Sequence, residues 1–368
     1  MLFVVNFDQF FITHRLPLAL ESIKKGYEVH VACSDTGKID YLKSLGITVH
    51  VLNLSRSGKS LSKELKSFIE IYKTLNNVKP NLVHFISIKP VLYGGIAARL
   101  INIPKKIFSI SGLGFVFTNK GCKASIFRIL IKAMYRLAIA GKDSHVIIQN
   151  PDDRVFVKSL IDVPTTIVKG SGVDLSEYDY ISENNENIKV CMASRLLKDK
   201  GVFEYVEAVK LLKEKFPFVV FELYGDIDPP NPASLSRIDI EKIKKNDFIN
   251  LYGFSSDIAK VFSDSNIIVL PSYREGLPKV LIEAAACGRA VVTTDVPGCR
   301  YAIEPNITGL LSNVKDSKSL SKAIEKLIVD NNLRNRMGKA GRKLAEREFD
   351  INNVVNKHFI IYHNSSKN

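Results

Sequence analysis

The sequence predicts an α/β protein with two doubly wound, Rossmann-like parallel-sheet domains that face a central cleft. Short runs rich in β-branched and aromatic residues alternate with helical patterns along all 368 residues. Several runs are apolar nearly throughout, as in strands covered by helices on both faces. The alternation restarts near residue 188, and alternating strands and helices favour parallel sheets. The length of the chain also suits two domains of middle size.

In the first half of the chain we expect seven strands, most of them separated by helices. They are residues 2–7, 28–33, 48–54, 82–88, 106–110, 145–150 and 165–170. The second half predicts five more, at residues 188–194, 219–225, 248–253, 267–272 and 290–295. The polar, turn-rich stretch 169–189 lacks helical periodicity and is the expected linker. The predicted domains are therefore residues 1–168 and 169–349.

Charge and cysteine content limit the expected partners and compartment. The formal net charge of +14 predicts an anionic partner, such as a nucleotide, a nucleic acid or an anionic membrane surface. The five cysteines are scattered, and no pair has metal-site spacing, which fits a reducing cytosol. The first residues predict a strand rather than a signal peptide, and no apolar run approaches the roughly 18–20 residues of a membrane span. We therefore expect a soluble protein, or one that lies on a membrane surface.

Two glutamates stand on either side of a predicted strand-to-helix turn in IIVLPSYREGLPKVLIEAAACG, residues 267–288. The strand ends at residue 272, and the helix begins near Pro278 and stops at Gly288. Glu275 then lies in the loop, and Glu283 lies about a turn and a half into the helix. Such carboxylates can accept hydrogen bonds from sugar hydroxyls, beside a helix N-terminus that suits phosphate. The alternative is that Glu275 caps the helix and Glu283 faces solvent.

Two cations follow the first strand of the second half, in ASRLLKDKG, residues 193–201. Arg195 comes directly after the strand, and Lys200 precedes a glycine and an amphipathic helix. In open parallel sheets, ligands bind outside the carboxyl ends of the strands. Arg195 and Lys200 could hold a diphosphate there and stabilise it as a leaving group. The alternative is two solvated surface charges.

A basic helix is predicted within NKGCKASIFRILIKAMYRLAIAGK, residues 119–142. At helical spacing Arg128, Lys132 and Arg136 share one face. Lys120 and Lys142 join this basic face, and the opposite face is expected to hold Ile126, Leu130, Ala133 and Leu137. Such a helix could lie on an anionic membrane. It could equally be a surface helix packed on the sheet with its basic side in solvent.

The segments SRLLKDKG and PSYREGLPKVLIEAAACGRAVVTTDVPG together resemble the signature of glycosyltransferase family 4, the retaining enzymes with a GT-B fold. The E-x7-E motif of that family maps onto Glu275 and Glu283, and its diphosphate-binding Arg and Lys map onto Arg195 and Lys200. GSGVD, residues 170–174, is similar to the family's segment at the domain junction. Over the whole chain the resemblance is to bacterial enzymes that build O-antigen, capsule and lipid-linked oligosaccharides.

The resemblance implies a role for each of these residues. It implies that Glu275 contacts the donor sugar hydroxyls, that Glu283 contacts the ribose, and that Phe254 lies near the base. It also gives sugar and phosphate contacts to the backbone of Gly276, Leu277, Pro278, Lys279 and Val280. The family transfers the sugar with retention and needs neither a protein nucleophile nor, in most members, a metal or other cofactor. Its last helix, here residues 350–368, crosses back onto the N-terminal domain.

The function implied is transfer of a sugar from a nucleotide diphosphate donor, with UDP favoured, to a lipid-linked saccharide on polyprenyl diphosphate. The C-terminal domain would bind the donor and the N-terminal domain the acceptor. The sugar would be an N-acetylhexosamine or a 6-deoxy form. The protein would be a cytoplasmic, peripheral protein at the inner membrane, in O-antigen or other surface polysaccharide synthesis.

The N-terminal half departs from the family pattern in two places. The family's glycine pair after the first strand is absent from NFDQFFITHRLP, and Ser111 stands before Gly112 where many relatives have histidine. His14, expected just after the first strand, is a candidate substitute in catalysis. The alternative is a helix-start residue without a catalytic role. His84, inside a strand, is expected to be a buried structural histidine.

Other classes of protein fit the sequence less well. Neither GLGFVF nor GSGVDL completes the G-x-G-x-x-G pattern of a nucleotide-binding oxidoreductase. Dispersed Lys and Arg without a recognition motif argue against a nucleic-acid binder. A GT-B-type nucleotide-sugar epimerase and a non-catalytic, membrane-associated assembly protein stay open as alternatives.

Overall fold

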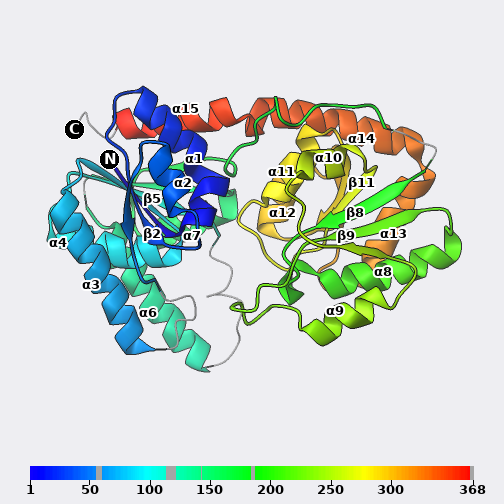
Figure 1. Cartoon of the computed structure of the whole chain (residues 1–368), viewed down its shortest axis with the longest axis horizontal. Coiled ribbons are helices and arrows are strands. Elements are labelled where there is room, and N and C mark those ends of the chain that lie inside the picture. Colours follow the sequence, from blue (N-terminus) through cyan, green and yellow to red (C-terminus); the bar gives the residue numbers. More distant parts are fainter. Residues whose placement is uncertain (55–59, 113–121, 142, 184–186, 365–368) are drawn as a thin grey trace. The chain divides into compact units, whose positions relative to one another are not determined.

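The computed structural model describes residues 1–54, 60–112, 122–141, 143–183 and 187–364. The side chains of residues 122–127 and 364 lie outside the description. The chain divides into two compact units (Figure 1). The N-terminal unit is Met1–Ser171 with Asn353–Asn368, and the C-terminal unit is Gly172–Asn352. The main boundary lies three residues beyond the predicted one at 168.

The N-terminal unit is built on a seven-stranded parallel sheet in the order β3-β2-β1-β4-β5-β6-β7. All seven predicted strands are present, so the first Rossmann-like domain is confirmed. Their bounds are β1 Leu2–Phe7, β2 His30–Ser34, β3 Thr48–Val51, β4 Leu82–Ile86, β5 Lys105–Ile110, β6 Ser144–Ile148 and β7 Thr165–Ile167.

Helices cover both faces of this sheet because successive side chains of a strand point to opposite faces. Leu2 and Val4 of β1 belong to the core under α3, α4 and α6, whereas the ring of Phe3 packs 5.4 Å from that of Phe11 on α1. The helices are α1 Asp8–Lys24, α2 Ile39–Ser44, α3 Leu61–Val78, the π-helical turn η1 Pro90–Gly94, α4 Gly95–Leu100, α6 Cys122–Ile139 and α7 Pro151–Leu160.

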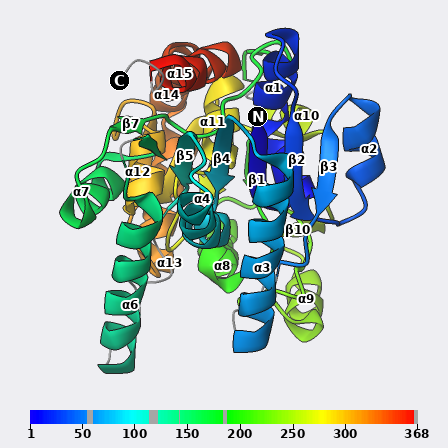
Figure 2. The same cartoon turned by 90° about the vertical axis from the view of Figure 1, so that its left-hand side faces the viewer.

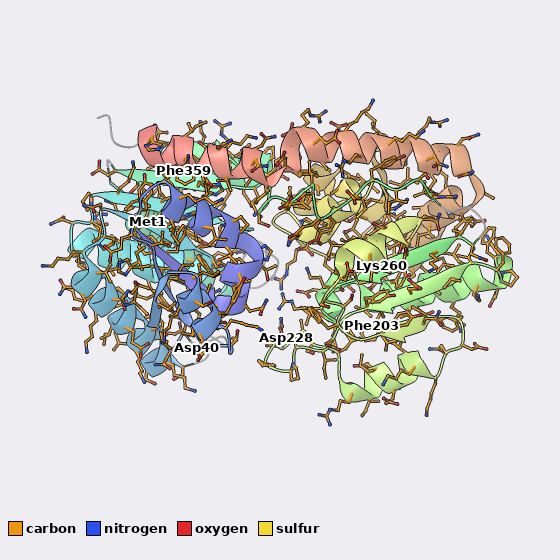
Figure 3. All side chains as sticks on the ribbon, turned by 45° about the horizontal axis from the view of Figure 1, so that its top comes forward. Met1, Asp40, Phe203, Asp228, Lys260 and Phe359 are labelled. Atoms are coloured by element: carbon orange, nitrogen blue, oxygen red, sulfur yellow. The ribbon has the colours of Figure 1, made fainter. Side chains whose placement is uncertain are left out.

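The last helix, α15 (Ile351–Asn364), packs on the N-terminal unit against α1 (Figure 1). The ring of Phe359, labelled in Figure 3, lies 6.3 Å from that of Tyr27. Tyr362 reaches the sheet, where its hydroxyl lies 2.7 Å from Nδ1 of His84. Nε2 of His84 lies 2.6 Å from the Ser109 hydroxyl, and the ring is buried. His84 is therefore the buried structural histidine that was expected.

The C-terminal unit holds a six-stranded parallel sheet in the order β10-β9-β8-β11-β12-β13. Five strands were predicted, and their observed bounds are β8 Lys189–Ala193, β9 Val220–Tyr224, β10 Asn250–Tyr252, β11 Ile267–Leu270 and β12 Ala290–Thr294. The edge strand β13, Gly309–Ser312, was missed. It has four residues and begins at a glycine, so it carries almost no periodic signal.

The helices of the C-terminal unit complete a second doubly wound domain, which confirms the predicted fold class. They are the 3-10 turn η2 Lys198–Lys200, α8 Val202–Lys215, α9 Arg237–Lys244, α10 Ile258–Ser263, α11 Lys279–Ala286, α12 Pro297–Ala302, α13 Ser317–Val329, α14 Asn331–Leu344 and the π-helical turn η3 Ala345–Phe349. Across the described residues of both units, every helix is too short or too polar to cross a bilayer.

Candidate active site

The loop after β8 carries Arg195 and Lys200 and ends at Gly201. Gly201 has φ +76°, in the left-handed region that favours glycine. A Cβ on Gly201 would lie 2.2 Å from the carbonyl oxygen of Pro271, which follows β11. Only glycine therefore lets the turn that holds Lys200 approach the end of the neighbouring strand.

The loop between β11 and α11 carries Glu275, and this loop meets the Lys200 turn. Strands β8 and β11 are parallel neighbours, so their carboxyl ends lie at the same edge of the sheet. There Lys200 Nζ forms an ion pair with Glu275 Oε1, and the Ser272 hydroxyl donates to the same oxygen at 2.7 Å. The two charged side chains are only 20% and 12% exposed. The structure thus brings together two residues that the sequence predicted for one site.

Two further contacts join the same two loops, and a third joins the Glu275 loop to α8. Arg274 donates to Asp199 at 2.8 Å, and the backbone N–H of Tyr273 donates to the Asp199 carbonyl at 2.9 Å. The Tyr273 hydroxyl donates to Glu204 on α8 at 2.6 Å. Burial and this hydrogen bond raise the pKa of Tyr273, so its hydroxyl stays protonated. Asp199 and Arg274 were not predicted as site residues, although each is adjacent in sequence to one that was.

Glu283 lies inside α11 and is buried. Its Oε1 accepts a hydrogen bond from the Tyr178 hydroxyl at 2.7 Å and lies 3.3 Å from Lys279 Nζ. Burial, and next the charge of Glu283, raise the pKa of Tyr178. The alternative that Glu283 faces solvent is therefore wrong.

The helix α11 has no side-chain cap. Pro278 is its N-cap residue, without a side-chain hydrogen bond, and Gly288 follows its end with φ +66°. The alternative that Glu275 caps this helix is wrong, whereas the start near Pro278 and the stop at Gly288 are confirmed. The backbone predicted to contact sugar and phosphate occupies the end of the loop and the first turn, as Gly276, Leu277, Pro278, Lys279 and Val280.

Arg195 forms its ion pair with a different loop from the one that carries Glu275. Its side chain is largely exposed and forms a 2.8 Å ion pair with Asp228, which Figure 3 labels. The loop that carries Asp228 is closed by a turn, in which the Asn231 N–H donates to the Asp228 carbonyl at 2.7 Å. In the described part of the chain, no three His, Cys, Asp or Glu side chains are grouped to hold a metal ion.

Phe254, expected near a base, follows β10 and is largely exposed. It stands next to a close junction of strand ends. Gly225, with φ +137°, donates its N–H to the Gly253 carbonyl at 3.1 Å. A Cβ on Gly225 would lie 1.8 Å from the Ser194 carbonyl oxygen, so glycine is required there. The loops that carry Arg195 and Phe254 are thereby held at the same edge of the sheet.

His14 lies in the N-terminal unit, in the second turn of α1. The prediction placed it just after β1, but helix α1 begins at Asp8, directly after the strand. Nδ1 of His14 lies 3.1 Å from the Ser171 hydroxyl, and its ring packs 4.5 Å from that of Phe10. The buried Arg15 donates to the His14 carbonyl at 2.8 Å. His14 therefore contacts the segment GSGVD.

The face of α6 that packs on the domain differs from the predicted apolar face. The buried residues are Ile131, Tyr135, Ala138 and Ile139. Leu130, Ala133 and Leu137 are exposed, so the prediction that they form the apolar packing face is wrong. Ile126, Lys120 and Lys142 lie outside the described side chains.

Arg128, Lys132 and Arg136 of α6 lie beside this packing face. Arg136 donates through Nε to the Leu160 carbonyl at 2.8 Å, and Lys132 Nζ lies 5.9 Å from the centre of the Phe156 ring. Lys132 and Arg136 are exposed, and Arg128 is half-buried. Lys132 and Arg136 thus lie on the surface of the N-terminal unit.

Sequence comparison matches both halves of the chain to known families. Residues 1–150 match the glycosyl transferase 4-like family, and residues 179–344 match the glycosyl transferases group 1. One relative is the N,N'-diacetylbacillosaminyl-diphospho-undecaprenol α-1,3-N-acetylgalactosaminyltransferase of Campylobacter jejuni, 29% identical over 96% of each chain. Another is the UDP-Gal:α-D-GlcNAc-diphosphoundecaprenol α-1,3-galactosyltransferase of Escherichia coli, 27% identical over 90% of this chain and 87% of the relative.

Solved structures share the fold. Sucrose-phosphate synthase from Thermosynechococcus elongatus has a TM-score of 0.80 at 18% identity, over 99% of this chain and 98% of that one. HepE of Anabaena in complex with UDP has a TM-score of 0.76, also at 18% identity, over 99% of each chain. At this identity the likeness concerns the arrangement of strands and helices alone.

Proposed function

We propose a donor, an acceptor and a stereochemical course for this chain. The chain belongs to the glycosyltransferases and joins a 4-like N-terminal domain to a group 1 C-terminal domain. The donor is a UDP-sugar, the acceptor is a saccharide on polyprenyl diphosphate, and the sugar is transferred with retention. The names of the relatives support the acceptor, because both act on saccharides linked to undecaprenol through diphosphate. The UDP-linked donor of the Escherichia coli relative supports the nucleotide.

The observation that carries this proposal is the Lys200–Glu275 pair at the carboxyl ends of β8 and β11. A cation and a carboxylate held side by side suit a sugar diphosphate, whose phosphates need positive charge and whose hydroxyls need acceptors. Lys200 and Arg195 stabilise the negative charge that develops on the diphosphate as its bond to the anomeric carbon breaks. Glu275 accepts hydrogen bonds from the donor sugar hydroxyls.

The remaining contacts position the substrates. Glu283, held by Tyr178 and Lys279, accepts hydrogen bonds from the ribose hydroxyls. The acceptor hydroxyl attacks the anomeric carbon on the face that the diphosphate leaves, and an oxygen of the leaving diphosphate takes its proton. The protein thus acts by positioning and charge stabilisation, with no nucleophile of its own and no metal ion.

The acceptor belongs to the N-terminal domain in this proposal, with His14 as the candidate residue near the reacting hydroxyl. The protein acts as a peripheral protein at the cytoplasmic face of the inner membrane, where polyprenyl-linked saccharides are assembled. The basic residues of α6, Arg128, Lys132 and Arg136, contribute attraction to anionic lipid. The transferred sugar is proposed to be an N-acetylhexosamine or a 6-deoxy form. The first of these is supported by the Campylobacter jejuni relative, whose name gives N-acetylgalactosamine as the sugar.

A thermal-shift panel with UDP, GDP, dTDP and ADP tests the donor. We expect UDP to stabilise the wild-type protein and to lose this effect in Lys200→Ala. Lys210→Ala, an exposed lysine on α8, is the matched control and should keep the UDP shift. An increase in Tm with another nucleotide but not with UDP would refute UDP as the nucleotide of the donor. An undiminished increase with UDP in Lys200→Ala would refute the assignment of Lys200 to the donor site.

A further inference from the structure

One face of α3 carries exposed apolar side chains along its length. They are Leu61, Leu65, Ile69 and Tyr72, with exposed fractions from 90% at Leu61 to 37% at Tyr72. The spacing of four, four and three residues places them on one stripe of the helix. The residues that pack α3 onto the sheet, Ser67, Ile71 and Leu75, form a different face and are buried. The α3 stripe is therefore additional to the core packing of the helix.

Two helices neighbouring α3 in sequence or space, α4 and α6, also carry exposed apolar side chains. Figure 2 shows α3, α4 and α6 in one layer, with α4 between the other two. Exposed Leu100 ends α4, and α6 exposes Ile129, Leu130 and Leu137. Of the 23 large apolar side chains exposed in the described residues, these three helices carry eight. Singly exposed apolar residues are normal, but a concentration of this kind marks an interaction surface.

The charge of the chain is concentrated in the same unit. Counted over the sequence, the N-terminal unit has 26 Lys and Arg against 11 Asp and Glu, a formal charge of +15. The C-terminal unit has 26 against 27, a formal charge of −1. On α3 the exposed lysines Lys66 and Lys73 lie beside the stripe, three residues before and four residues after Ile69. The α3 stripe thus has a basic border.

We propose that the α3 stripe inserts into the boundary between headgroups and acyl chains of an anionic phospholipid bilayer. A helix with an apolar face and a lysine-rich flank has the pattern of an interfacial membrane helix. A symmetric dimer through this face would bring two units of formal charge +15 together, because a twofold interface uses the same patch on both copies. An anionic bilayer instead neutralises the charge that borders the stripe.

This inference deepens the proposed function, since it names apolar insertion by α3 in addition to the electrostatic attraction proposed for α6. It was not foreseen from the sequence. A bilayer contact through this layer would hold the N-terminal unit against the membrane that contains a polyprenyl-linked acceptor.

Because the chain contains no tryptophan, a single introduced tryptophan reports on one position. Leu65→Trp places the probe in the stripe, and Phe218→Trp places it at an equally exposed site of the C-terminal unit, 64% against 61%. We expect phosphatidylglycerol vesicles to shift the emission of the Leu65→Trp protein to the blue and leave that of Phe218→Trp unchanged. Equal responses of the two proteins, or no response at position 65, would overturn the proposal. So would a blue shift without vesicles that grows with protein concentration, which would indicate a second copy.

A binding measurement keeps the test independent of the probe. We expect Leu61→Gln with Leu65→Gln to weaken sedimentation with phosphatidylglycerol vesicles by about tenfold or more, the order expected for losing two inserted leucines. The control pair Ile238→Gln with Val329→Gln changes two residues of the C-terminal unit that are each 68% exposed, and it should bind as the wild type. Unchanged binding of the α3 variant would overturn the proposal. Neither experiment uses a nucleotide or a sugar, so its failure is distinct from a failure of the donor assignment.

Discussion

Breaking the Lys200–Glu275 pair should destabilise the C-terminal unit by an amount that its burial sets. Removing one partner of a fully buried pair costs about 3–5 kcal/mol, whereas an exposed pair contributes about 0–1 kcal/mol. Lys200 and Glu275 lie between these limits, at 20% and 12% exposure. Ser272 still donates to Glu275 when the lysine is gone. We therefore expect Lys200→Met to lower the free energy of unfolding by about 2 kcal/mol.

The coupling between the two residues isolates the pair itself. In a cycle with Glu275→Gln, we expect the double variant to lose about 1–2 kcal/mol less than the sum of the single variants. Lys215 and Glu325 supply the control cycle, because their 3.0 Å pair lies in the same unit but is 59% and 32% exposed. There the coupling should stay below about 0.5 kcal/mol.

Urea unfolding of the full chain, monitored through amide hydrogen exchange in β8 and β11, reports on the C-terminal unit alone. For a unit of this size, about 2 kcal/mol corresponds to a fall in Tm of roughly 4–8 °C. A coupling no larger than that of the control cycle would refute the argument, since it would mean that the pair is hydrated and not held in the folded protein.

Three further predictions follow from the proposed function and from the buried groups of the N-terminal unit. Transfer should survive dialysis against EDTA, because the proposed mechanism uses no metal ion, and a loss that only added Mg²⁺ restores would contradict it. Changing Arg128, Lys132 and Arg136 together to Glu should lower binding to phosphatidylglycerol vesicles in a sedimentation assay, most strongly at low salt; unchanged binding would reject the role of α6. Burial and the charge of Arg15 lower the pKa of His358 to about 3. The contribution of the neutral His358 to the free energy of unfolding is therefore complete above the unfolded pKa of about 6.5 and is lost as the pH falls. The loss at about pH 5 is about 2 kcal/mol, and a scan of Tm against pH should show a shallower fall in His358→Gln than in the wild type.

The fold could be predicted because burial on both faces leaves a strong signal. Strands such as β4 and β11 are nearly continuous apolar runs, and each was found within a few residues of its bounds. The packing face of α6 could not be chosen in the same way. Ile129, Leu130 and Ile131 are consecutive and point in different directions, so apolar residues surround the helix. The contacts with η1 and α4 decide that Ile131 is buried, and these contacts form only in the folded domain.

The site shows the same division between local and tertiary information. Topology alone predicts that Lys200 and Glu275 meet, since both follow strands that are neighbours in a parallel sheet. Tyr178 could not be found in this way, because it lies 105 residues before Glu283 and in the stretch that the sequence indicated as a linker. Yet its hydroxyl and Lys279 together hold Glu283 Oε1 within the buried part of α11. A carboxylate held in one position loses little side-chain entropy when it accepts a hydrogen bond from a ligand. The tyrosine thus gives Glu283 the fixed orientation that the proposed contact with the ribose requires.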